Sequence, residues 1–400
     1  MTAGAPPSHT PSHDAASLPV RSEETLRQRQ QQGRLRVRLA ADYRRLVQEQ
    51  GLAAAYEQTD VVVAANAEFS DQASLHLGLG PVDPPIRLRD PQLDGVAALA
   101  GGGTDLVLPL AGGGIERRAG VRGGAQVLAA LLAGESVLLS AAGDVTPLLP
   151  RRELNLRLDR QQIGQGRLLL HRAIGENGLV AVSSAEGVVR TPWGPLLGPW
   201  GSALCTSAGA GSIGLTMPGL SLLGPGSPVL VAGAIGWVVG IGTAHQPQVR
   251  RLPGGQARAP GATAAVAVDW QELNPRWIRA CFFEGHGSAL LVAIAAPVPL
   301  IDATIALQAA ATDSELEVPV LDLSIPRRLK PGFGAVPYSA VKSGEITVAG
   351  RRVRVAPAHS PALADAVAQD LVIRLRDGRF PLRLPLLPLS DRPSLLPLEA

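Results

Sequence analysis

Residues 40–63 read AADYRRLVQEQGLAAAYEQTDVVV, and this stretch decides how the rest of the chain is interpreted. Its first part predicts two helices, over Ala40–Gln50 and Leu52–Gln58, separated by Gly51. It ends in Asp60 followed by three valines, a pattern typical of a buried strand. Helices therefore give way to strands near residue 60, which indicates a mixed α/β protein.

The sequence on either side extends this pattern. Ser22, followed by Glu23 and Glu24, predicts the start of a polar helix that ends at about Gln32. After residue 63, short apolar runs alternate with Gly- and Pro-rich turns. We expect strands at Leu35–Leu39, Leu179–Ser183, Val229–Ala232, Trp237–Ile241, Ala264–Val268 and Leu290–Ala295. We expect further helices at Ala125–Ala133, Asn274–Ala280 and Pro361–Leu375.

The expected architecture is an α/β (mixed α+β), strand-rich, single large domain with N-terminal helices, Gly-rich loops and a small C-terminal subdomain. Residues 1–20, rich in Pro, Ser and His, are expected to form a disordered tail. Residues 21–326 would form the core domain. Residues 327–400 would form the C-terminal subdomain and tail, packed on that core. Within it, Glu345–Val348 and Val353–Ala356 predict a hairpin joined by Gly350.

Composition excludes several classes of protein. A net charge of +3, from 37 basic and 34 acidic residues, is too balanced for a nucleic-acid-binding surface. No apolar run reaches the roughly 18–20 residues that span a bilayer, and no basic segment precedes an apolar run as in a signal peptide. We therefore expect a cytoplasmic protein without a membrane partner. Two cysteines and unpaired histidines predict no metal site, and no cofactor is evident.

Individual motifs favour a small ligand without identifying it. Gly209–Gly214 fits the pattern G-x-G-x-x-G, but Pro218 prevents the long helix that a dinucleotide site needs. A flexible or tightly turning loop is the better interpretation, and its backbone amides offer hydrogen-bond donors to an anion. Cys205, at the mouth of this loop, is either an activated thiol or a small buried side chain. His245 and His286, at strand ends beside glycines, are either site residues or structural histidines.

The order of segments along the chain resembles the homocysteine biosynthesis (sulfur-incorporation) family over about residues 22–390. The matching segments are Asp60–Val62, Asp83–Ile86, Gly123–Ala125, Pro150–Leu154, Gly194–Leu197, Ser207–Gly209, Gly233–Gly236, Gly242–Pro247, Pro297–Pro299, Tyr338 and Ser343–Ile346. The resemblance implies an L-aspartate semialdehyde sulfurtransferase, in which the aldehyde takes up sulfur and the adduct is reduced to homocysteine. It also implies a cysteine persulfide as sulfur carrier and, in many members, a ferredoxin-like iron–sulfur partner as reductant.

The resemblance places the two family cysteines at Asp71 and Leu148, neither of which is a thiol. The activity would then need direct attack by sulfide, or Cys205 as a relocated carrier with His245 as acid or base. The expected substrate-binding residues are Arg151, Arg152, Ser207, Gly209, Gly211 and Thr243. The alternative is a catalytically retired or repurposed relative that binds a small anionic metabolite or a protein partner. The sequence also leaves open that the chain forms a homo-oligomer, or that it is an enzyme with a changed substrate.

Overall fold

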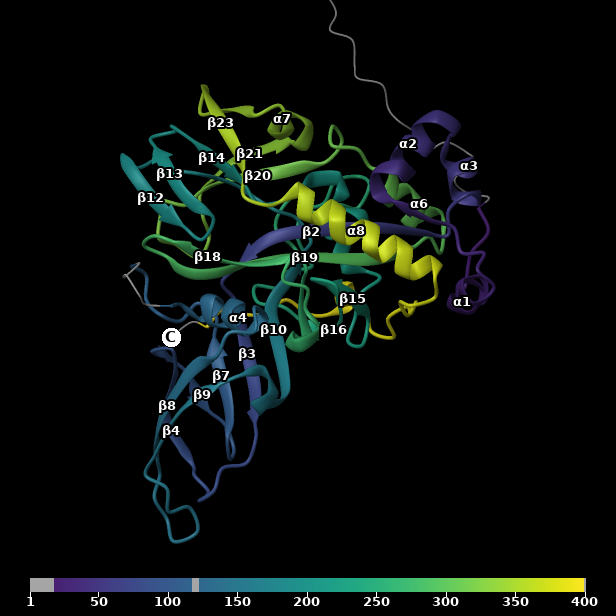
Figure 1. Cartoon of the computed structure of the whole chain (residues 1–400). Coiled ribbons are helices and arrows are strands. Elements are labelled where there is room, and N and C mark those ends of the chain that lie inside the picture. Colours follow the sequence, from purple (N-terminus) through teal and green to yellow (C-terminus); the bar gives the residue numbers. More distant parts are fainter. Residues whose placement is uncertain (1–17, 117–121, 399–400) are drawn as a thin grey trace, which may run out of the picture.

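The largest sheet contains eleven of the strands in the computed structural model, which describes residues 18–116 and 122–398 (Figure 1). Its strands are β1 (Val37–Leu39), β2 (Val61–Ser70), β3 (Ala73–Leu79), β6 (Leu99–Ala100), β7 (Asp105–Pro109), β10 (Ile163–Gly175), β15 (Pro228–Val231), β16 (Ala234–Ile241), β17 (Thr263–Asp269), β18 (Ile278–Phe283) and β19 (Gly287–Pro299). Their order is β1-β2-β19-β15-β16-β17-β10-β3-β7-β6, and β18 pairs with β19. Strand β1 is parallel to β2, and the other pairs are antiparallel.

A six-stranded sheet joins the C-terminal region to the middle of the chain. Its strands are β11 (Val180–Val182), β14 (Ala203–Cys205), β20 (Glu317–Asp322), β21 (Gly332–Pro337), β22 (Glu345–Val348) and β23 (Arg351–Pro357), in the order β21-β20-β11-β14-β23-β22. Strands on both sides of residue 326 thus share one sheet, and the boundary at that residue stays a prediction. Two smaller sheets contain β4 (Leu88–Leu93), β5 (Val96–Ala97), β8 (Val137–Gly143) and β9 (Glu153–Leu158), and β12 (Gly187–Thr191) with β13 (Gly194–Gly198).

The described residues contain eight α-helices. The helices are α1 (Glu23–Gln31), α2 (Ala40–Gln50), α3 (Leu52–Glu57), α4 (Gly124–Leu132), α5 (Ile213–Thr216), α6 (Ala303–Ala310), α7 (Tyr338–Lys342) and α8 (Pro361–Arg376). Of these, α8 makes the most contacts with β2 and β19 of the large sheet, and α7 packs on β21 and β22 of the six-stranded sheet. Helix α8 lies across β2 and β19 (Figure 1). The Ser360 hydroxyl caps it by accepting a hydrogen bond from the Leu363 amide. In the part of the chain that the structure describes, no helix is long and apolar enough to cross a membrane.

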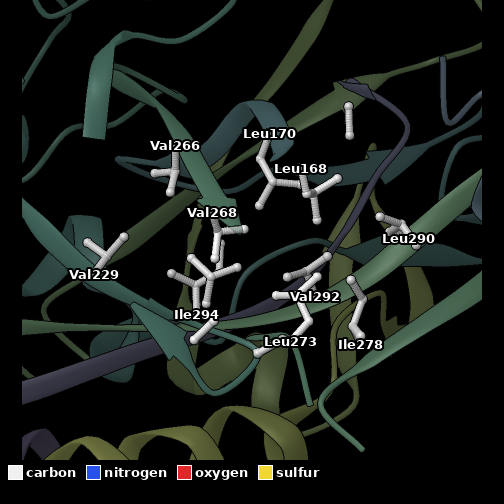
Figure 2. Close-up of a cluster of buried hydrophobic side chains, with 14 of the residues drawn as sticks. Leu168, Leu170, Val229, Val266, Val268, Leu273, Ile278, Leu290, Val292 and Ile294 are labelled. Atoms are coloured by element: carbon white, nitrogen blue, oxygen red, sulfur yellow. The ribbon is translucent and has the colours of Figure 1, made fainter. Parts of the chain in front are cut away.

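The two faces of β2 pack into different hydrophobic clusters, because successive side chains of a strand point to opposite faces. Val61, Val63 and Ala65 pack beneath α8, whereas Val62 and Ala64 face the main core. Figure 2 shows that core, where Leu168 and Leu170 of β10 meet side chains of β17, β18 and β19. Both faces of β19 are covered, which explains why all its residues are buried.

The structure confirms the mixed α/β, strand-rich fold and the helix–helix–strand order around Gly51. Gly51 has a φ of +83°, a conformation that favours glycine. The β22–β23 hairpin is also confirmed. The helix expected over Asn274–Ala280 is wrong: Ile278–Phe283, rich in β-branched and aromatic residues, pairs with β19 instead.

The N-terminal tail expected over residues 1–20 lies outside the described residues, except for its last three. Of those three, Pro19 accepts a hydrogen bond of 2.7 Å from the Tyr56 hydroxyl. Val20, in contrast, is exposed. The described end of this segment is therefore held against α3.

Candidate functional site

A small polar pocket lies where β2 turns into β3 and faces β10. We call it the Arg172 pocket; its cavity volume is about 170 Å³. Its polar walls come from the end of β2, from the β2–β3 turn, from β10 and from the residues that follow β10 and β14. The polar side chains among its lining residues are Glu68, Ser70, Asp71, Gln72, Arg172, Asn177 and Thr206. A pocket of this size and polarity suits a small charged metabolite.

Glu68 lies on the same face of β2 as Val62 and Ala64, two earlier residues that pack in the main core. Residues 62, 64, 66 and 68 share this face, so the apolar pair Val62 and Ala64 is followed by the polar pair Asn66 and Glu68. The Asn66 side-chain amide donates a 2.6 Å hydrogen bond to Glu68 Oε1, and Asn66 Oδ1 accepts one from the Ile213 amide. This network fixes the carboxyl group in the pocket wall.

The Glu68 carboxyl has a pKa of about 7. Burial raises it, while the Asn66 hydrogen bond and the positive charge of Arg172 act in the opposite direction. A carboxyl group with this pKa is partly protonated at neutral pH. Glu68 can therefore both donate and accept a proton under working conditions.

Arg172 supplies the positive charge of the pocket. It follows Leu170 on β10, where the register against β17 shifts, and its side chain lines the same pocket as Glu68. Burial lowers its pKa, and the charges of Glu68 and Asp71 partly offset this effect. No residue that the structure describes forms a hydrogen bond or ion pair with its guanidinium, whose donors are free to bind a carboxylate as a pair.

Asp71, one of the two positions assigned to a family cysteine, lies at the rim of this pocket. Its Oδ2 atom is 2.9 Å from Nε2 of His286, which is in the turn between β18 and β19. His286 is one of the two histidines that the sequence singled out at a strand end. The structure thus brings it to Asp71, although 215 residues separate the two in sequence.

Three of the predicted site residues line a larger cavity and not the Arg172 pocket. Cys205, Ser207 and Gly211 face a cavity of about 530 Å³ between α2 and α8, which we call the α2–α8 cavity. The Cys205 thiol donates to the Ser207 carbonyl oxygen at 3.4 Å, and burial raises its pKa to about 11. It is therefore protonated at neutral pH and a poor nucleophile. Gly209 lies behind this wall, close to Asp313 and Tyr338.

Thr243 and His245 follow β16, and Thr243 contacts a residue that lines the Arg172 pocket. Its hydroxyl donates to the Gln72 side chain, which lines the pocket. His245 is fully buried, and its Nδ1 atom accepts a 3.0 Å hydrogen bond from the Thr263 amide. Burial lowers the pKa of His245, so this ring is neutral at pH 7. This placement fits the structural interpretation of His245 better than a role in proton transfer.

The remaining predicted residues lie on the segment between β8 and β9. Leu148, the second cysteine position, is in this segment and 84% exposed. Arg151 donates to the carbonyl oxygens of Glu153 and Asp83, and Arg152 is also exposed. None of the three lines the Arg172 pocket. The structure therefore does not bring the two family cysteine positions together within one copy of the chain.

Sequence reasoning missed Glu68 and Arg172, although a signal for both was present. Each continues an apolar every-second-residue pattern with a charged side chain on the buried face, which is costly unless the group is used or paired. The described residues contain no group of three or more His, Cys, Asp or Glu side chains that could hold a metal ion.

A family model described as "Homocysteine biosynthesis enzyme, sulfur-incorporation" matches residues 36–382. The chain belongs to this homocysteine biosynthesis family. A relative from Methanocaldococcus jannaschii, named L-aspartate semialdehyde sulfurtransferase, is 28% identical over 84% of this chain and 67% of its own length. A relative of the same name from Methanosarcina acetivorans is 26% identical over 87% of this chain and 68% of its own length. No solved structure matches this family member.

Proposed function

We propose that this chain incorporates sulfur into L-aspartate semialdehyde to form homocysteine, and that the Arg172 pocket binds the aldehyde. Family membership and the names of the two relatives support the reaction. The observation that carries the choice of pocket is the unpaired Arg172 guanidinium beside a Glu68 carboxyl with a pKa of about 7. The α2–α8 cavity is about three times larger and mostly apolar, so it suits this small polar substrate less well.

The charges of the pocket suit an amino acid that carries an aldehyde. Arg172 would hold the substrate carboxylate through two parallel N–H donors. The Asp71 carboxylate at the rim would attract the substrate ammonium group, and its contact with His286 orients it. This arrangement places the aldehyde toward Glu68, the group in the pocket wall that can exchange protons at neutral pH.

No cysteine lines the Arg172 pocket, so sulfur would enter as sulfide. The sulfide sulfur forms a bond to the aldehyde carbon while the C=O π bond breaks, and Glu68 donates a proton to the oxygen. Loss of water leaves a C=S bond. Two electrons and two protons from an external reductant then convert this bond to the thiol of homocysteine. A ferredoxin-like iron–sulfur protein in the cytoplasm, as the family resemblance implies, is our proposed electron donor.

Purified protein incubated with L-aspartate semialdehyde, sulfide and a strong chemical reductant should produce homocysteine, which mass spectrometry detects. Changing Arg172→Gln should raise KM for the aldehyde about 100-fold, because two charge-assisted hydrogen bonds to its carboxylate are lost. Arg167→Gln is the matched control, since Arg167 lies on the same strand with its side chain on the opposite, exposed face. Equal KM values for the two variants would argue against this pocket.

The absence of a thiol from the pocket also favours a second candidate, a family member that binds a small anionic metabolite without this chemistry. In that case the wild type would bind L-aspartate by calorimetry, Arg172→Gln would not, and neither would form homocysteine. A cysteine-containing relative assayed in parallel would show that the assay itself works.

A Cys205→Ser, Cys281→Ser double variant should form homocysteine at a rate within about twofold of wild type. Burial raises the pKa of both thiols, and neither lines the Arg172 pocket. Initial rates measured at saturating sulfide test this expectation. A loss of activity that follows Cys205→Ser alone would instead support a relocated sulfur carrier.

A further inference from the structure

The α2–α8 cavity has no role in the proposed reaction, yet it is the larger of the two pockets described above. Its lining residues come from helices α2, α7 and α8, from strands β1, β2, β14 and β23, and from the segment that follows β14. Apolar side chains make up most of its surface, among them Leu39, Val63, Ala65, Val341, Val355 and Ala364. Ligand sites in proteins commonly have this volume, a mostly apolar lining and a few polar groups.

Arg44 of α2 is the main charged group in this lining. One of its guanidinium nitrogens donates to the Ala210 carbonyl oxygen at 2.8 Å. Its other donors have no hydrogen-bond partner in residues 18–116 and 122–398. Burial lowers its pKa, and the negative charge of Asp313 acts in the opposite direction. A partly desolvated guanidinium with free donors is a strong site for an anionic group.

Arg44 is better placed to bind an anion than the other charged groups at the cavity. The Lys342 ammonium is 2.5 Å from Asp313 Oδ2, so that cation already has a counter-ion. Asp313 Oδ1 accepts from the Ala210 amide and does not contact the Arg44 guanidinium. Asp365 of α8 is exposed to solvent. Burial lowers the pKa of His359, so its ring is neutral and adds no charge.

A wall of protein separates this cavity from the Arg172 pocket. The Tyr338 hydroxyl, on the cavity side, donates a 2.6 Å hydrogen bond to Asn177 Oδ1, on the pocket side. The backbones of Glu68 and His359 also form a bridge between the two. A ligand of the cavity therefore contacts residues that differ from those proposed to hold the aldehyde.

We propose that the α2–α8 cavity is a second ligand site, for a molecule with an apolar body and an anionic head group such as a carboxylate, sulfonate or phosphate. The head group contacts Arg44, and the apolar body fills the space between α2 and α8. The unpaired donors of Arg44 select the charge, and the size and apolar lining of the cavity select the body. This inference does not depend on the reaction proposed for the Arg172 pocket.

Calorimetry with the full chain tests this proposal, with decanoate as the probe below its micelle concentration. We expect one decanoate to bind per chain and decyltrimethylammonium, with the same chain length and the opposite charge, not to bind. Arg44→Gln should weaken decanoate binding about tenfold or more, because a charge-assisted hydrogen bond is lost. Arg45→Gln, which changes an exposed neighbour paired with Asp42, should leave it unchanged.

A second variant tests the position of the apolar body. Ala364→Phe places a large side chain in the cavity and should abolish decanoate binding. If this variant does not fold, the comparison of Arg44→Gln with Arg45→Gln still tests whether decanoate binds at this cavity. Decanoate binding that is unaffected by Arg44→Gln, or equal binding of the cationic probe, would overturn the proposal. Homocysteine formation is not measured in these experiments, so their failure would leave the proposed reaction untouched.

Discussion

Glu68→Gln should lower the rate of homocysteine formation at pH 7 by about 10²–10⁴-fold, the range typical for loss of a general acid–base group. The glutamine keeps the size of the side chain and can accept the hydrogen bond from Asn66, but it cannot transfer a proton. The wild-type rate should change with a midpoint near pH 7, which is the pKa of Glu68, and the residual rate of the variant should lack this step.

Rates measured between pH 5 and 9, with homocysteine quantified by mass spectrometry, test this expectation. Glu57→Gln is a suitable control, because Glu57 is an exposed carboxylate at the end of α3. A variant that retains the wild-type rate and its pH midpoint would remove Glu68 from the mechanism.

The stability of the same variant separates a catalytic loss from misfolding. A carboxyl whose pKa is raised in the folded state, from 4.5 to about 7, favours unfolding once it ionises. This cost is absent below pH 4.5, grows between pH 4.5 and 7, and is complete above pH 7. Glu68→Gln should therefore be more stable than wild type at pH 8.5 by up to about 3 kcal/mol, and equally stable at pH 4. Urea denaturation at the two pH values measures the difference.

The local parts of the fold could be predicted from the sequence, because their signals lie within a few residues of one another. Gly51 between two helices and Gly350 between two strands are signals of this kind. The long strand β10 was missed, because its pairing with β3 and β17 joins segments that are remote in sequence. Arg172 is missed with it, because its alternation with Leu168 and Leu170 has a meaning only within a strand.

The structure brings some of the predicted site residues together and changes the chemistry expected of others, for one physical reason. The family resemblance singles out Asp71, and a place beside glycines at a strand end singles out His286; the structure brings these two side chains together. The predictions for Cys205 and His245 assume ordinary pKa values. Burial changes that chemistry, because it raises the pKa of Cys205 and lowers that of His245. The sequence around each residue does not show its burial.

Asp60→Asn should lower the free energy of unfolding by about 3–5 kcal/mol, the cost of breaking a buried ion pair on one side. Asp60, the residue before the three valines of β2, is fully buried. Its carboxylate accepts hydrogen bonds from the backbone amide and side chain of Arg36 and from the side chain of Arg29. The buried guanidinium of Arg21 lies 3.6 Å away. An amide at this position would leave three cations without a counter-ion.

The contribution of Asp60 to stability should depend on pH in the opposite direction to that of Glu68. Burial acts to raise the pKa of Asp60, but the hydrogen bonds and charge of Arg36 outweigh it and hold the pKa below 3.8. A lowered pKa contributes stability that is complete above the unfolded-state value and is lost as the pH falls through the folded-state value. The destabilisation by Asp60→Asn should thus be the same at pH 6 and pH 8. Urea denaturation at both values tests it, with the exposed Asp42→Asn as a control expected to change stability by less than about 1 kcal/mol. Equal stabilities of the two variants would show that the three arginines do not depend on Asp60.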